Sequence, residues 1–318
     1  MRERAGLGQM RRATPLHPSH SGPNPASTMS RSPANLPFFR IGPERPASPV
    51  VLSVPHAGRD YRPELLRAAR LGKAVLETLE DRLVDRLIWR ATTAGATAFV
   101  ARAPRAEIDL NRDERELDPA LIHPPLPSGS LVQSARTRGG LGLVPSRIAG
   151  AGPIWRERIE RAELNRRIEE IHQPYHRAIA KALDLARERF GAAILLDCHS
   201  MPPRARMAGG AGAASVIFGD RHGTTIDADL LDAAVGAARA LGYKTACNAP
   251  YAGGYVVGRH GRPRQGQHAL QIELDRSIYL DADLRAPGPG FEGACRLIAK
   301  VADALETRLL DCAQIAAE

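Results

Sequence analysis

Leu195-Leu196-Asp197-Cys198-His199-Ser200 is the stretch that decides the fold. It completes an apolar run that begins at Ala192, and Pro202-Pro203 interrupts the chain soon afterwards. A short apolar run bounded by turn residues predicts a buried strand. Open α/β sheets bind their ligands at the carboxyl ends of their strands, where His199 would lie. The stretch therefore predicts an α/β sheet with an imidazole at its binding edge.

A second apolar run, Val50–Val54, ends in a similar way, in Pro55-His56-Ala57-Gly58. Taken singly, each histidine is best explained as an imidazole satisfied by backbone hydrogen bonds at a strand end. Two strands that deliver His56 and His199 to one sheet edge can instead assemble a metal site from distant parts of the chain. Together with the acidic strand described below, the pair favours the metal site.

Strands and helices alternate from Pro49 onward, which predicts a three-layer α/β fold with a mixed central sheet and helices on both faces. Residues 119–153 are rich in Pro, Gly and Ser and are expected to form a long loop, often a lid or substrate wall. The expected strands are 50–54, 96–101, 192–197, 214–218, 243–247 and 268–274, with a short extended piece at 107–110; the expected helices are 73–91, 155–190 with a break near Pro174, 228–241 and 291–310.

The first 46 residues differ in composition from the rest. They hold 8 of the 25 prolines, and their seven arginines and two glutamates supply +5 of the net charge of +9. With no hydrophobic periodicity, they predict a disordered basic tail followed by a single domain over residues 47–318. Translation could also begin at Met29. The segment has no apolar core of the kind that a secretory signal needs.

Composition argues against several classes of protein. The 272 residues after the tail carry only +4, and aromatic residues make up 4% of the chain, too few for the stacking platforms of single-strand nucleic-acid binders. No stretch is apolar for long enough to span a membrane. The four cysteines form no C-x-x-C pair, which argues against thiolate zinc sites and disulfide frameworks and favours a reducing cytoplasm.

Two catalytic motifs are also missing. Gly209–Gly212 lacks the spacing and the Lys-Ser/Thr of a phosphate-binding loop. The chain contains no G-x-S-x-G elbow, so a serine hydrolase of that kind has no support.

The expected strand 268–274 carries an acid, Glu273, after two apolar positions. A carboxylate in a central strand is costly unless it has a partner or a function. Glu273 could form a buried ion pair with an arginine, or it could act as a general base beside a metal-bound water. The strand alone leaves both open.

Asp109-Leu110-Asn111-Arg112, with Arg105 nearby, is a further polar cluster. Its arginines could bind carboxylates bidentately, although composition alone favours a surface ion-pair network. His172 and His176 are spaced i, i+4, but Pro174 lies between them and no glutamate follows His172. They lack the H-E-x-x-H pattern and are interpreted as helix-capping or packing residues.

Taken together, these motifs resemble the N-formylglutamate amidohydrolase family. The resemblance covers roughly residues 50 to 280, and the motifs occur in the order of the family. It implies a phosphorylase/hydrolase-like α/β fold akin to zinc carboxypeptidases, and hydrolysis of N-formyl-L-glutamate to formate and glutamate in histidine degradation. The motifs are Ser53-Val54-Pro55-His56-Ala57-Gly58, Asp109-Leu110-Asn111-Arg112, Asp197-Cys198-His199-Ser200, Gly253-Gly254-Tyr255 and Gln271-Ile272-Glu273.

The resemblance also implies one zinc ion per chain. His56 and His199 would be two of its ligands. Zinc carboxypeptidases place an acid three residues after their first histidine, but Arg59 stands at that position here. The resemblance points instead to Asp81, at the start of a helix-borne run, with Asp85 or Glu273 as the alternative third ligand.

The remaining roles follow from the same resemblance. Glu273 would take a proton from the attacking water and give it to the leaving amine. Arg112, Asn111 and Arg105 would hold substrate carboxylates, and Tyr255, after Gly253-Gly254, would close over the substrate. The expected partner is a small acidic N-acyl amino acid, with neither nucleic acid nor membrane involved.

Three alternatives remain open. The protein could be a metallohydrolase of another N-acyl amino acid or of a peptide end. It could be a metal-free binding protein on the same fold, with structural histidines. It could also bind nucleic acid through the basic tail.

Overall fold

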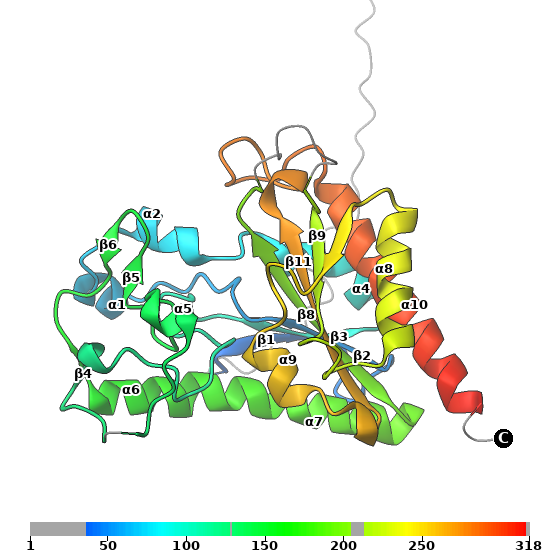
Figure 1. Cartoon of the computed structure of the whole chain (residues 1–318), viewed down its shortest axis with the longest axis horizontal. Helices are drawn as coiled ribbons and strands as arrows, with labels where there is room; N and C mark the ends of the chain where they lie inside the picture. Colours follow the sequence, from blue (N-terminus) through cyan, green and yellow to red (C-terminus); the bar gives the residue numbers. More distant parts are fainter. Residues whose placement is uncertain (1–35, 128, 205–212, 316–318) are drawn as a thin grey trace, which may run out of the picture.

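A seven-stranded mixed sheet forms the centre of the molecule (Figure 1). The structure is a computed structural model that describes residues 36–127, 129–204 and 213–315. The strand order is β1-β3-β2-β8-β11-β9-β10, in which β1 pairs antiparallel with β3, β9 pairs antiparallel with β11, and the other pairs are parallel. The strands are β1 (Phe38–Ile41), β2 (Val50–Val54), β3 (Thr97–Ala101), β8 (Ala193–Met201), β9 (Val216–Gly219), β10 (Thr245–Cys247) and β11 (Gln267–Asp275).

Helices cover both faces of this sheet, so the expected three-layer α/β architecture is confirmed. One face packs on α3, α4, α8 and α10, and the other on α6, α7 and α9. The helices are α1 (Pro63–Ala68), α2 (Lys73–Leu76), α3 (Val84–Leu87), α4 (Trp89–Thr93), α5 (Ala135–Arg138), α6 (Arg161–Arg167), α7 (Gln173–Phe190), α8 (Ala228–Ala240), α9 (Tyr255–His260) and α10 (Phe291–Ile315).

Each central strand supplies both hydrophobic cores. In β8, Ile194 and Leu196 face the core under α8 and α10, whereas Ala193 and Leu195 face the core under α7. Successive side chains of a strand point to opposite faces, so a strand buried on both sides is apolar along most of its length. The apolar runs of the sequence therefore correspond to the buried central strands.

The segment around α1, α2 and α5 lies to one side of the sheet (Figure 1). It includes two small sheets, β4 (Ile122–His123) with β7 (Ile159–Glu160), and β5 (Arg147–Ile148) with β6 (Gly152–Pro153). The expected loop 119–153 thus contains short elements, and several of its apolar side chains, such as Leu143 and Val144, are buried. The extended piece expected at 107–110 is a buried loop, with no strand.

The expected helix 73–91 is wrong as one continuous element. Instead α2 passes into a 3-10 turn, Glu77–Leu79, and the chain leaves the helical path before α3 and α4. Leu83 adopts a φ of 62°, which no helix interior contains. The apolar periodicity of the segment is real, but the break at Glu80 and Asp81 serves the site described below.

The expected helix 155–190 begins later, at Arg161, and runs through Pro174. A π-helical turn, Ile168–His172, joins α6 to α7 immediately before the proline. Proline has no N–H to bond to the preceding turn, and a wide turn is one way to accommodate it. The break expected near Pro174 is therefore a local widening.

The expected tail boundary at residue 46 is also wrong, because β1 lies before it and pairs with β3 along four residues. Met29 and Gly209–Gly212 lie outside the described residues. In the described part of the chain, no helix is both long and apolar enough to cross a bilayer. Cys198, Cys247 and Cys295 are free thiols, and Cys198 is buried in the core.

Candidate active site

Three neighbouring parallel strands deliver polar side chains to one sheet edge. His56 follows the end of β2, His199 lies near the end of β8, and Glu273 lies near the end of β11. The register aligns Ser53 with Asp197, and Glu273 with His199. The carboxyl ends of parallel strands meet at the same edge, so residues far apart in sequence come together here.

His56, Asp81 and His199 form a buried group whose ligand atoms all lie within 4.8 Å of one another. The Nδ1 atoms of His56 and His199 lie 3.2 and 2.9 Å from Asp81 Oδ2. Ligands about 2.0–2.2 Å from a tetrahedral zinc ion lie roughly 3.3 Å from each other. Both the spacing and the His-Asp-His donor set fit such an ion, so these three residues could hold a metal.

The break in the expected helix places Asp81. Its backbone N–H donates to the carbonyl oxygen of His56 at 2.9 Å, which ties the segment to the end of β2. Asp81 Oδ1 accepts a hydrogen bond from Ser200 Oγ at 3.1 Å and lies 3.4 Å from Arg276 Nη2. One carboxylate oxygen is therefore anchored, and the other faces the two histidines.

The alternative third ligands are placed elsewhere. Asp85 forms an ion pair with Arg59, the residue three positions after His56. Glu273 is not a member of the His56–Asp81–His199 group. Of the three acids, Asp81 is therefore the one that lies with the two histidines.

Two acids hold the outer nitrogens of the histidines. His56 Nε2 donates to Asp109 Oδ1 at 2.7 Å, and His199 Nε2 donates to Asp197 Oδ2 at 2.8 Å. These bonds leave each Nδ1 lone pair free for an ion, an arrangement common in metal sites. Neither acid is among the site residues expected from the sequence. Asp197 could have been found from the sequence, because it stands two residues before His199 and thus on the same face of β8.

The electrostatics of the site favour a positive charge between the histidines. Burial alone would lower the pKa of His199, but Asp197 and Asp81 raise it well above its usual value. Burial alone would raise the pKa of Asp109, but Arg105, Arg112 and His56 lower it well below the usual range. Charged acids thus surround the histidines, which suits a bound cation.

Glu273 is buried, and its Oε1 accepts a hydrogen bond from Gln271 Nε2 at 2.9 Å. Burial raises the pKa of Glu273 to about 7, with His199 and Arg105 opposing the rise and Asp81 adding to it. Among the described residues, no arginine lies within ion-pair distance of it, so the buried ion pair considered above is absent. A carboxyl group with a pKa near neutrality can both accept and donate a proton.

Arg105 and Arg112 approach the site from the loop after β3. Arg105 Nε donates to Asp109 Oδ2 at 2.9 Å, and the acids Asp109, Asp81 and Glu273 raise its pKa against the effect of burial. Arg112 is buried, with Nε donating to Leu141 O at 2.8 Å. Its Nη2 is 3.7 Å from Asp109 and has no hydrogen-bond partner in the described part of the chain. The cluster is thus buried and does not form a surface network.

A family model described as N-formylglutamate amidohydrolase matches residues 48–280. This chain belongs to the N-formylglutamate amidohydrolase family. It is similar to an N-formylglutamate deformylase of Pseudomonas aeruginosa, with 30% identity over 73% of this chain and 82% of the relative. A solved N-formylglutamate amidohydrolase from Ralstonia eutropha JMP134 is 34% identical over 88% of this chain and 98% of that chain, with a TM-score of 0.77.

A solved protein from Agrobacterium tumefaciens shares the fold at 16% identity, with a TM-score of 0.58 over 86% of this chain and 96% of that chain. The resemblance seen in the sequence motifs is therefore confirmed at the level of the family. The chain is an amidohydrolase of the N-formylglutamate deformylase type, with a buried His-Asp-His group.

Two histidines of the α6–α7 helical segment donate hydrogen bonds to the loop that carries the family motif Asp109–Arg112. His172 Nε2 donates to Arg112 O at 2.9 Å, and His176 Nε2 donates to Leu110 O at 3.0 Å. From the sequence, His172 and His176 are expected to be helix-capping or packing residues. They are buried, but their hydrogen bonds position this loop and cap no helix.

Asn111 is held by hydrogen bonds on both sides of its amide group. Its Oδ1 accepts from Val256 N at 2.9 Å, and its Nδ2 donates to Gln271 Oε1 at 3.4 Å. Gly254 packs against it so closely that a Cβ added there would lie 2.2 Å from Asn111 Oδ1. Gly254 is therefore required at this position, because only a residue without a Cβ leaves room for Asn111.

Tyr255 is not brought together with the other predicted site residues. Its ring contacts His172 and His176, and its hydroxyl accepts from Arg259 Nη1 at 2.7 Å. Tyr251, in contrast, interacts electrostatically with Glu273. Burial raises the pKa of Tyr251, and Glu273 raises it further, so Tyr251 shares the environment of Glu273.

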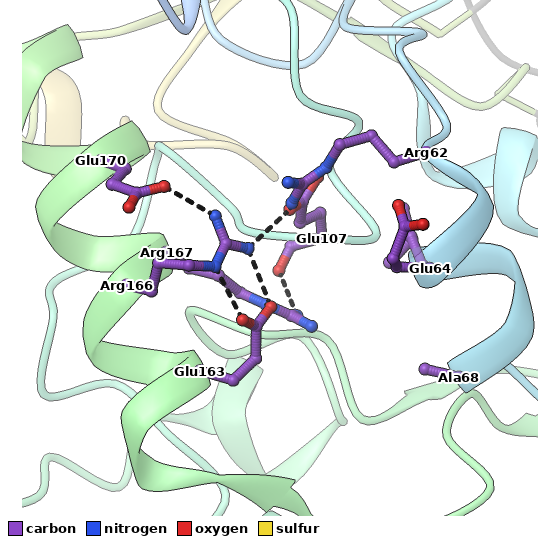
Figure 2. Close-up of a pocket in the computed structure, with 9 residues that line it drawn as sticks. Arg62, Glu64, Ala68, Glu107, Glu163, Arg166, Arg167 and Glu170 are labelled. Atoms are coloured by element: carbon purple, nitrogen blue, oxygen red, sulfur yellow. Dashed lines mark hydrogen bonds and ion pairs between the residues drawn. The ribbon is translucent and has the colours of Figure 1, made fainter.

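A separate cavity of about 500 Å³ lies beside α1 and α6 and contains none of the site residues (Figure 2). Its charges pair with one another: Arg166 pairs with Glu163 at 2.7 Å and with Glu170 at 2.8 Å. Glu107 pairs with Arg62 and Arg166, and its carbonyl oxygen accepts from Arg167 Nη1 at 2.9 Å. This network anchors the chain two residues before Asp109.

Proposed function

We propose that this protein hydrolyses N-formyl-L-glutamate to formate and L-glutamate with one zinc ion per chain. The observation that carries the proposal is the buried group of His56, Asp81 and His199, with Glu273 on the adjacent strand. Membership of the family and the names of the relatives support this substrate.

Zinc would be held by His56 Nδ1, His199 Nδ1 and Asp81 Oδ2. Two neutral imidazoles and one carboxylate are a common catalytic zinc set, which leaves a position open. When bound, zinc acts as a Lewis acid toward a carbonyl oxygen and lowers the pKa of water toward neutrality. Asp109 and Asp197 keep the two imidazoles in the tautomer that this binding requires.

Glu273 is the proposed general base and acid. As a carboxylate, it takes a proton from the water that attacks the formyl carbon, and it then gives that proton to the departing amide nitrogen. Its pKa near 7 suits both transfers at neutral pH. Gln271 keeps the carboxyl oriented through the bond to Oε1.

Arg105 and Arg112 have distinct proposed roles. Arg105 lies among Asp109, Asp81 and Glu273, where its charge can stabilise negative charge that develops on the formyl oxygen. Arg112 can offer its free Nη2 to the α-carboxylate of the substrate, beside the side chain of Asn111.

Three free thiols suit a reducing compartment, and we place the reaction in the cytoplasm.

The deciding experiment combines metal analysis with a formate-release assay. The purified protein should contain about one zinc ion per chain, His199→Ala should lose most of it, and N-formyl-L-glutamate should be the best of a panel of N-acyl amino acids. Full metal retention in His56→Ala and His199→Ala would disprove the site. Equal cleavage of carboxylate-free formamides would disprove the substrate.

A further inference from the structure

The short helix α5 lies next to the buried Arg112. Ser134 caps this helix by accepting a hydrogen bond from Thr137 N at 3.1 Å. After the helix, Leu141 N donates to Arg136 O at 2.8 Å, and Leu141 O accepts from Arg112 Nε, also at 2.8 Å. One residue, Leu141, therefore ties the backbone of Arg136 to the side chain of Arg112.

The chain of hydrogen bonds continues to the proposed base. Arg112 Nη1 donates to Asn111 O at 2.5 Å. Asn111 Nδ2 donates to Gln271 Oε1 at 3.4 Å, and Gln271 Nε2 donates to Glu273 Oε1 at 2.9 Å. Helix α5 is thus connected to Glu273 through consecutive hydrogen bonds.

Arg136 differs from its neighbours because its guanidinium has no hydrogen-bond or ion-pair partner among the described residues, although the residue is half-buried. By contrast, Arg138 on the same helix is exposed and donates through Nη1 to Gln133 O at 2.9 Å. A guanidinium that is partly removed from water is stabilised by a hydrogen-bonding partner, because it carries five donors. The described part of the chain thus leaves Arg136 free to bind a charged group of a ligand.

Its charge reaches three groups of the site. Arg136 opposes the effect of burial on the pKa of Glu273 and on the pKa of Tyr251, and it adds to the lowering of the pKa of Arg112 that burial begins. Glu273, Tyr251 and Arg112 come from different parts of the chain. A single guanidinium whose charge acts on all three lies near each of them.

We propose that Arg136 is a specificity-determining residue that binds the side-chain carboxylate of an acidic N-formyl amino acid. The inference rests on the proposed function. Glutamate has two carboxylates, and a tight site needs a cation for each. Arg112 is buried beside Asn111 and suits the α-carboxylate, which is two bonds from the scissile nitrogen. Arg136, on the half-buried outer side, suits the carboxylate that is four bonds from it.

The test compares two substrates that differ in one charge. N-formyl-L-glutamine keeps the α-carboxylate of N-formyl-L-glutamate but has a neutral side chain. Arg136→Ala should lower kcat/KM for N-formyl-L-glutamate by about 10- to 100-fold, the loss of one charge-assisted hydrogen bond, mostly through KM. The same variant should change kcat/KM for N-formyl-L-glutamine by less than about 3-fold.

Arg138→Ala is the matched control, since it removes the same charge from the same helix and should leave both substrates unaffected. Arg136→Lys should recover part of the loss, and zinc content and melting temperature should match the parent in every variant. Equal losses for the two substrates, or no loss for either, would overturn the proposal. Failure of the parent to release formate from N-formyl-L-glutamate would instead overturn the proposed function.

Discussion

His176 Nε2 lies 3.0 Å from the carbonyl oxygen of Leu110, and this bond fixes the proton positions of a pair of histidines. A carbonyl only accepts, so His176 carries its proton on Nε2. Its Nδ1 must then accept from His260 Nε2, which lies 3.1 Å away. Since Leu110 directly precedes Asn111, the pair supports the loop that carries Asp109, Asn111 and Arg112.

We expect His176→Ala to reduce kcat/KM for the formylated substrate by about 10- to 100-fold, because a small displacement of positioning groups costs that much. Zinc content should stay near the parent level, since Asp197 still holds His199. His176→Gln should restore part of the activity, because an amide can also donate to Leu110 O. Steady-state kinetics beside metal analysis check this, and a fall in stability alone with unchanged kinetics would contradict it.

A second prediction concerns pH and stability. Burial lowers the pKa of His260 to about 3, and burial, His172 and His260 lower the pKa of His176 well below its usual value. Between the unfolded value near 6.5 and the folded value, the unfolded chain binds more protons than the folded one. The two neutral histidines therefore contribute fully to the free energy of unfolding above about pH 6.5, and this contribution is lost as pH falls.

For His260 alone the loss amounts to about 2 kcal/mol between pH 6.5 and pH 5. The free energy of unfolding, measured by urea denaturation across this range, should decrease toward acid. His260→Gln keeps a donor for His176 and should show a shallower decrease. The same slope in the parent and in this variant would show that other groups dominate the acid instability.

The third prediction separates the proposed base from the metal ligands. Glu273→Gln should retain zinc, because His56, Asp81 and His199 remain, while kcat falls by about two to four decades. Inductively coupled plasma analysis and formate release measure the two quantities on one sample. Loss of the metal in Glu273→Gln would mean that Glu273 is a ligand and that the selection of Asp81 is wrong.

The strands could be predicted from the sequence because their side chains are buried on both faces. Val50–Val54 coincides with β2, and β8 and β11 extend the expected strands by a few residues. Both histidines and Glu273 were found because each lies at or near the end of such a run. Where burial alone determines structure, the apolar pattern is sufficient.

The position of Asp81 beside the two histidines could not be predicted in the same way. The periodic apolar residues of segment 73–91 indicate a helix, and what interrupts it is a contact with His56, distant in sequence. Arg136 lies in a Pro/Gly/Ser-rich segment without periodicity, and its place depends on the hydrogen bond between Arg112 and Leu141. Long-range polar contacts of this kind leave no local pattern.

The last prediction uses the contact between Gly254 and Asn111. A Cβ at residue 254 would lie 2.2–2.4 Å from the amide atoms of Asn111, which cannot retreat easily because its Oδ1 accepts from Val256 N. Gly254→Ala should therefore displace Asn111 and lower kcat/KM by about 10- to 100-fold with zinc retained.

Gly236 provides the control, because it lies exposed in α8 with nothing within 4 Å of an added Cβ. Gly236→Ala should leave activity unchanged and stabilise the protein by up to about 1 kcal/mol, the helix propensity difference between the two residues. Activity and melting temperature of the two variants, measured side by side, test the contact. If Gly254→Ala were as active as Gly236→Ala, the placement of Asn111 would not matter for the reaction.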